Sequence, residues 1–200
     1  MLQKKYFKKV SLIASLLLLS NISSAAFMIE PSIGYRQETI KFTDLLLNQS
    51  QIKMNSPIFE LKLGVATPTG ISFDLAASRS SGKVNFEPAL SESPEYTHTL
   101  GSVQVGVNAM GILKIYLGYI LHDEFETQST SSFSGYKLTG QGYQAGLMTF
   151  PFPHLGLGLQ YNIHQFKEIS GAAYTNGKDV KNYFEKIDAQ DVSASLSVLF

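Results

Sequence analysis

The C-terminal segment 191–200 alternates between apolar and small polar side chains along its whole length. The even positions are apolar: Val192, Ala194, Leu196, Val198 and Phe200. The odd positions hold Asp191 and three serines, with Leu199 as the one exception. Neighbouring side chains of a β-strand point to opposite faces, so a two-residue period predicts a strand with one apolar and one polar face.

Seven earlier segments have the same period: 27–36, 59–66, 71–78, 102–107, 113–122, 142–147 and 155–164. Three connections between them are tight and contain glycine or proline: 67–70, 108–111 and 151–154. Four others are long and polar: 38–56, 79–97, 123–135 and 167–186. This alternation of short turns and long loops predicts an all-β fold, an eight-stranded antiparallel up-and-down transmembrane β-barrel with both termini on the short-turn side.

The first 26 residues have the pattern of a secretory signal peptide. Lys4, Lys5, Lys8 and Lys9 precede the apolar run 10–19, and Ser24-Ala25-Ala26 supplies small residues for cleavage. The run is too short for a membrane-spanning helix. We therefore expect a signal peptide at 1–26 and a barrel domain at 27–200, with cleavage one residue earlier or a retained anchor as alternatives.

The charge of the mature chain argues against a nucleic-acid partner. Cleavage removes four of the 16 basic residues and none of the 16 acidic ones, which leaves a net charge of −4. Nucleic-acid-binding domains are usually basic. The chain also has no cysteine, so it has neither disulfides nor thiolate metal sites.

The composition of the two faces indicates which one meets lipid. The polar faces are rich in glycine: Gly34, Gly64, Gly106, Gly118, Gly146, Gly156 and Gly158. Small residues fit the narrow interior of an eight-stranded barrel. The apolar faces carry no ionised residue, and a Lys or Arg at the bilayer midplane would cost about 2–4 kcal/mol. We expect the apolar face to point outward; a soluble lipocalin-like carrier, with the faces reversed, is the alternative.

Charged residues fall on the polar, inward face of the predicted strands: Glu30, Arg36, Glu60, Lys62, Asp74, Lys114 and Asp191. Buried charges must be paired and hydrogen-bonded. We therefore expect a salt-bridged network that fills the interior and leaves no open pore; a gated ion or proton path is the alternative.

These features resemble the small outer-membrane barrels: the opacity proteins, outer membrane protein X and the transmembrane domain of outer membrane protein A. The resemblance covers residues 27–200 and rests on strand number, loop asymmetry, the signal peptide and the terminal Phe200. It implies the outer membrane of a Gram-negative bacterium, contact with membrane lipid and lipopolysaccharide, and recognition of Phe200 by the barrel-assembly machinery. It also implies four extracellular loops serving envelope integrity, adhesion or surface recognition, with the surface partner unspecified.

No catalytic motif is visible. Lipid A deacylases of the outer membrane use a histidine with a serine two residues later, and none of His98, His122, His154 and His164 has one. We expect the first, second and fourth of these to be interior or rim residues. We expect the acidic segment 122–126 to be a solvated rim, with a divalent-cation or lipopolysaccharide-bridging site as the alternative. The prediction is no enzyme, no cofactor and no metal, with a lipid-A-modifying enzyme as the alternative.

Overall fold

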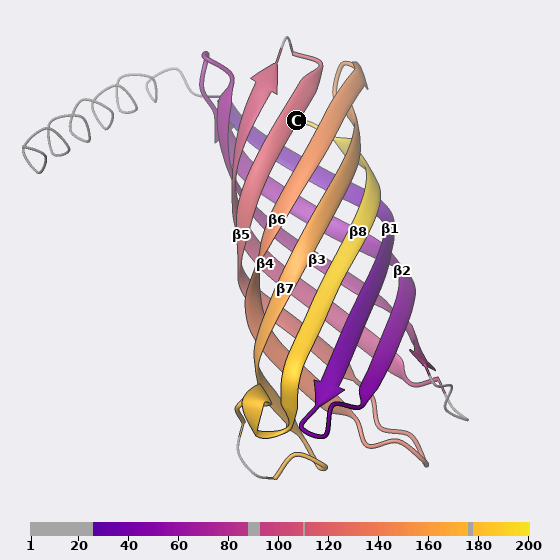
Figure 1. Cartoon of the computed structure of the whole chain (residues 1–200). Helices are drawn as coiled ribbons and strands as arrows, with labels where there is room; N and C mark the ends of the chain where they lie inside the picture. Colours follow the sequence, from indigo (N-terminus) through magenta and orange to yellow (C-terminus); the bar gives the residue numbers. More distant parts are fainter. Residues whose placement is uncertain (1–25, 88–92, 110, 176–177) are drawn as a thin grey trace, which may run out of the picture.

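The computed structural model describes residues 26–87, 93–109, 111–175 and 178–200, and it is a closed barrel of eight strands. The strands are β1 (Ala26–Asp44), β2 (Gln49–Ala66), β3 (Ile71–Glu87), β4 (Glu95–Ala109), β5 (Leu113–Thr127), β6 (Tyr136–Phe152), β7 (Leu155–Gly171) and β8 (Phe184–Val198). Each pairs antiparallel with its neighbour in sequence, and β8 pairs with β1 (Figure 1). The predicted fold class is confirmed. The predicted signal peptide falls on 1–25, outside the described residues, and on Ala26, where β1 begins.

The tight turns and the C-terminus share one end of the barrel (Figure 1). Gly70 and His154 have φ angles of 85° and 66°, the left-handed conformation that ends a strand sharply. Ile29 and Phe200 exchange two backbone hydrogen bonds of 3.1 and 3.0 Å, which tie the last residue to β1. Among the described residues, no helix is long and apolar enough to cross a membrane.

A belt of exposed apolar side chains surrounds the half of the barrel next to the tight turns. Ile115, Leu117, Leu157 and Leu159 point outward, with 54, 67, 49 and 57 % of their surface exposed. On β1 the belt runs from Phe27 to Tyr35, which corresponds to roughly 20–25 Å of height for a tilted strand. This height matches the apolar band of a membrane barrel, so the prediction of an outward apolar face is confirmed.

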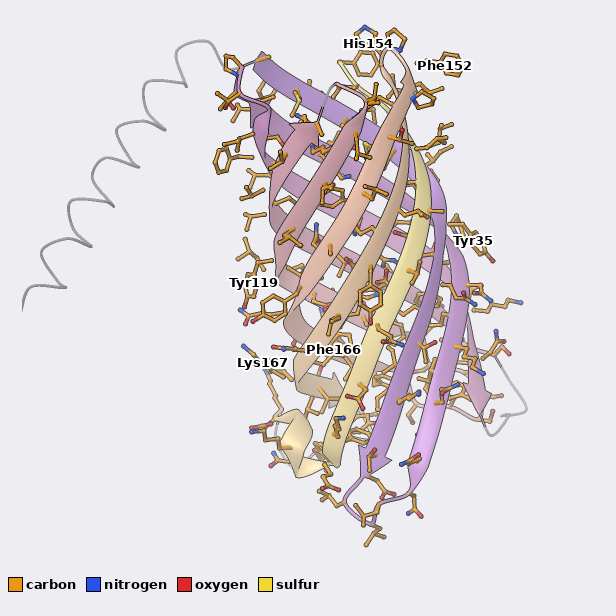
Figure 2. The ribbon with its side chains drawn as sticks, turned by 45° about the horizontal axis from the view of Figure 1, so that its top comes forward. Tyr35, Tyr119, Phe152, His154, Phe166 and Lys167 are labelled. Atoms are coloured by element: carbon orange, nitrogen blue, oxygen red, sulfur yellow. The ribbon has the colours of Figure 1, made fainter. Side chains whose placement is uncertain are left out.

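Aromatic residues mark both edges of the belt. Figure 2 shows Phe152 at the tight-turn end and Tyr35 and Tyr119 on the flanks of the barrel. Tyr143 packs against Tyr119, with ring centroids 5.4 Å apart, and both are on the edge nearer the loops. Aromatic rings favour the interface between lipid and water, so the two girdles delimit the part of the barrel in lipid.

Beyond the belt the strands continue, and the prediction of long loops at 38–56, 79–97, 123–135 and 167–186 is wrong for most of these residues. The β1–β2 connection is only 45–48, and the β5–β6 connection is 128–135. The two-residue period continues here with opposite polarity. Ile40 and Met54 are buried inside, while Lys41 and Lys53 lie on the outside.

The interior of this half, which lies opposite the tight turns and which we call the loop half, is an apolar core. Its buried members are Ile40, Phe42, Ile52, Met54, Val84, Tyr96, Phe125, Tyr136, Leu138, Phe166, Ile169, Val180 and Ala189. On the tight-turn side of this core, inside the belt, the interior is mostly polar and includes Ser72, Gln104 and Gln160. The barrel therefore changes from membrane-protein polarity to soluble-protein polarity along its length.

One seam in the wall opens in the loop half. The pairing of β7 with β8 ends at His164↔Ala189. From that point toward the loops, β7 pairs only with β6, and the start of β8 pairs only with β1. The gap is partly covered by the 3₁₀ helix Val180–Asn182 and by a bridge from Glu168 to Asp179.

Candidate functional site

Six buried polar residues from five strands meet inside the barrel, where the polar and apolar parts of the interior adjoin. We call them the histidine–carboxylate cluster: Arg36 and Glu38 of β1, His98 of β4, Asp123 of β5, His164 of β7 and Asp191 of β8. None exposes more than 3 % of its surface. Because its side chains come from strands on all sides of the wall, the cluster joins segments far apart in sequence.

Two histidines and three carboxylates form a continuous hydrogen-bonded chain. His98 donates from Nδ1 to Glu38 Oε2 at 2.9 Å and from Nε2 to Asp123 Oδ1 at 2.7 Å. His164 donates from Nδ1 to Asp123 Oδ2 at 2.7 Å and from Nε2 to Asp191 Oδ2 at 2.8 Å. Asp123 thus bridges the two rings, and each ring lies between two carboxylates.

Asp191, at one end of this hydrogen-bonded chain of side chains, is held by residues of β1 and β7. Arg36 Nε lies 3.6 Å from Asp191 Oδ2, and Arg36 Nη1 donates to Ser80 Oγ at 3.2 Å. Asn162 Nδ2 donates to both oxygens of Asp191, at 2.9 and 3.1 Å. Glu38 Oε1, in contrast, has no hydrogen-bond partner within the described structure.

The charge of the cluster follows from its hydrogen bonds. An ionised carboxylate can only accept, so every ring nitrogen that faces one must carry a hydrogen. The carboxylates of Glu38, Asp123 and Asp191 carry three negative charges, and the guanidinium of Arg36 is the permanent cation among the six residues. With neutral imidazoles these charges sum to −2. A buried site needs this charge compensated. Two imidazolium protons compensate it, and one divalent cation would do the same.

Aromatic rings close the cluster on the side of the loop half. Phe166 stacks on His164 with centroids 5.9 Å apart, and Phe125 meets His98 edge-on at 5.7 Å. The two imidazoles are themselves 5.1 Å apart. The polar network therefore ends where the apolar core begins, and water has little access from the loop side.

A β-bulge in β5 brings Asp123 into the cluster. Gly101 pairs with His122 and Ser102 with Ile120, so Leu121 is an extra residue in β5. Leu121 and His122 both lie on the outside, and Asp123 points inward. The prediction of His122 as an interior or rim residue is therefore wrong, and 122–126 is a strand whose Asp123 is buried, not a solvated rim.

The other predicted interior charges form two smaller groups in the belt half. Lys62 Nζ lies 3.2 Å from both Glu30 Oε1 and Glu60 Oε2, and 4.8 Å from the ring centre of Tyr116. Lys114 Nζ lies 2.8 Å from Asp74 Oδ2. Arg36 and Asp191 belong to the cluster described above.

Sequence reasoning missed Glu38 and did not bring His98, Asp123 and His164 together. Continuing the two-residue period of β1 past Arg36 places Glu38 on the same inward face. The same period places His98 inward on β4 and His164 inward on β7. Phe200, predicted as the assembly signal, lies exposed at the tight-turn end.

Comparison with known proteins identifies the fold. No protein-family model matches the sequence, and no curated protein matches it. Among solved structures, Ail, the attachment invasion locus protein of Yersinia pestis, superposes with a TM-score of 0.55 at 14 % identity, covering 86 % of this chain and 98 % of Ail. Its complex with the heparin analogue sucrose octasulfate gives 0.52 at 16 % identity, covering 87 % and 99 %.

A second solved structure with this fold is the outer membrane protein AlkL, determined in lipid bilayers. It superposes with a TM-score of 0.54 at 13 % identity, covering 86 % of this chain and 90 % of AlkL. Together with the exposed apolar belt, the superpositions show that the chain has the fold of the small eight-stranded outer-membrane β-barrels.

Proposed function

We propose that this barrel is a surface-recognition protein that holds an apolar loop tip away from the membrane. The loop half of the strands is the extracellular half in this proposal. It has its own apolar core, which makes it a stiff continuation of the barrel rather than a set of mobile loops. Aromatic contacts such as Phe42 with Phe184, at 5.1 Å, fix the strands near the tips.

The observation that carries the proposal is the β1–β2 turn. Leu45, Leu46 and Leu47 expose 60, 83 and 68 % of their surface at the end of the longest hairpin. Three neighbouring leucines in water are unfavourable unless a contact covers them. A rigid apolar tip is suited to contact with a protein or a lipid surface.

The turn that presents the leucines is preorganised by Asp44. Its Oδ1 accepts hydrogen bonds from the backbone N–H groups of Leu46 at 2.8 Å and Asn48 at 2.9 Å. Its Oδ2 accepts a third, from Asn48 Nδ2, at 2.9 Å. A tip already held in one conformation loses less entropy on binding.

The outer surface around the tip favours apolar over ionic recognition. Lysines and acids alternate on the extracellular half, for example Lys137 with Glu124 at 2.7 Å and Lys186 with Asp188 at 2.9 Å. Ail was solved with a polysulfated sugar. A polyanion would need a one-signed basic patch, so for this chain we propose an apolar partner surface.

Adhesion of living cells tests the proposal. The chain is expressed in a laboratory Gram-negative strain, and bound bacteria are counted on epithelial monolayers and on phosphatidylcholine-coated plates. The variant Leu45→Ser/Leu46→Ser/Leu47→Asn should lower binding to the level of the empty strain at equal surface expression. The control Lys186→Ser, an exposed change elsewhere on the extracellular half, should leave it unchanged. Equal binding by the leucine variant and the unaltered chain would refute the proposal.

A further inference from the structure

The histidine–carboxylate cluster contains the donor atoms of a metal site. We infer that His98, Asp123 and His164 bind one divalent transition-metal ion, of which zinc fits best. One ligand atom from each residue lies within 4.8 Å of the others, and all three side chains are buried. Two imidazoles with one carboxylate suit zinc, copper or nickel, whereas magnesium and calcium prefer oxygen ligands alone.

The three donor groups lie within 4.8 Å of one another, and each imidazole is in contact with Asp123. Asp123 Oδ1 lies 2.7 Å from His98 Nε2, and Asp123 Oδ2 lies 2.7 Å from His164 Nδ1. Ligand atoms around tetrahedral zinc are about 3.3 Å apart, given bonds near 2.0–2.1 Å. A small outward movement of the side chains would make room for the ion, which would replace the two protons that now face Asp123.

The two outer carboxylates are arranged as second-sphere partners. Glu38 accepts from His98 Nδ1 at 2.9 Å, and Asp191 accepts from His164 Nε2 at 2.8 Å. Metal-binding histidines nearly always donate their other ring N–H to such an acceptor, which fixes the tautomer and orients the ring. The ion would therefore meet His98 through Nε2 and His164 through Nδ1.

Charge also specifies the ion. With neutral imidazoles, Glu38, Asp123, Asp191 and Arg36 sum to −2, which one divalent cation neutralises. Two ring protons leave as the ion enters, so the total charge of the buried cluster stays the same. A monovalent cation would leave a buried negative charge uncompensated, which is costly in this interior.

The open seam between β7 and β8 supplies a route to the site. A cleft of about 520 Å³ lies there, and its lining includes His164, Phe166, Ala189, Thr39 and Asp188. Three protein ligands leave one position of a tetrahedral ion free. The cleft reaches His164, the ligand nearest the seam, from the outside of the wall.

Cobalt spectroscopy tests the site directly. The barrel, extracted from membranes in detergent and freed of metal with a chelator, is titrated with Co²⁺ and then with Zn²⁺. We expect one equivalent of Co²⁺ to give the intense visible absorption of a four- or five-coordinate ion, and one equivalent of Zn²⁺ to abolish it. Mg²⁺ and Ca²⁺ should not compete. If the unaltered protein gives no such band, the inference is wrong, whatever the variants do.

Variants locate the ion. His98→Gln and His164→Gln should each weaken Co²⁺ binding at least a hundredfold, and Glu38→Gln about 10–100-fold through the lost orienting hydrogen bond. His122→Gln is the matched control, because His122 lies outside the barrel on the bulge. It should bind as the unaltered protein does. A band that survives both interior histidine changes would place the metal elsewhere and also refute the inference.

Discussion

Leu121 and His122 are neighbours in β5, yet both side chains point out of the barrel. The extra residue at this bulge reverses the alternation, so that Asp123 instead of His122 faces the interior. Bulges re-aim side chains in this way and recur beside functional sites. In this sequence Asp123 reaches the histidine–carboxylate cluster because the bulge takes up one residue of β5.

Deletion of Leu121 should remove the bulge and keep the cluster. In the shortened strand Ile120 points inward, His122 outward and Asp123 inward, so His98 and His164 keep their shared acceptor. Asp123→Leu removes that acceptor, and loss of one partner from a buried ion-paired network typically costs about 3–5 kcal/mol. Urea unfolding in phospholipid vesicles should show a decrease of this size in the free energy of unfolding for Asp123→Leu and a much smaller one for the deletion; an equal loss in both variants would contradict the argument.

Asp191→Asn should destabilise the barrel by about 3 kcal/mol or more. Asp191 accepts from His164 and Asn162 and lies 3.6 Å from Arg36, so its neutralisation leaves the guanidinium unpaired in the interior. Asp188→Asn changes an exposed carboxylate on the same strand and serves as the control. Urea unfolding of both variants measures the difference, and similar midpoints would show that the interior pair contributes little.

The membrane half of the fold could be predicted because a single physical rule holds there. Lipid requires apolar side chains outside, and a narrow interior requires small or paired polar ones. Segments such as 27–36 and 155–164 therefore carry a regular period and mark their strands. The tight turns could be predicted because glycine and proline favour the backbone conformations of turns.

The loop half could not be recognised by that rule because its polarity is reversed. Its outward face is charged, as at Lys41 and Lys53, while Ile40 and Met54 fill the interior. A search for outward apolar faces reads such strands as polar loops. The period itself was still present, so a reading that allowed either polarity would have extended β1 and β2.

The cluster was harder to predict than the strands. Its members come from five strands, and sequence periodicity gives the face of each residue but not its height in the barrel. Asp123 depends on a bulge in the segment Ile120-Leu121-His122-Asp123, which has no glycine or proline to mark it. Convergence of Glu38, His98 and His164 follows only from the register between strands.

Gly146→Ala should weaken the packing of the membrane half. A Cβ at this position would lie 2.1 Å from Tyr116 Cζ, so the ring of Tyr116 would have to move. That ring donates a hydrogen bond of 2.8 Å to Gln160 and contacts Lys62. Overpacking of this kind costs about 1–3 kcal/mol. Ala145→Val, on the lipid-facing side of the same strand, is the control for urea unfolding; equal stability of Gly146→Ala and the unaltered chain would contradict the prediction.

Protonation of Asp44 should release the leucine tip. The hydrogen bond from the Asn48 side chain lowers the pKa of Asp44 below its ordinary value. The carboxylate therefore stabilises the turn at pH values above its ordinary pKa, and that contribution is lost as the pH falls through the lowered pKa. Nuclear magnetic resonance of the Asn48 side-chain amide should show a transition below the pKa of an ordinary aspartate. Asp44→Asn should abolish the transition, loosen residues 45–47 and reduce adhesion, while urea unfolding of the barrel stays unchanged. A transition at the ordinary aspartate value, or adhesion that does not depend on Asp44, would show that this turn does not organise the tip.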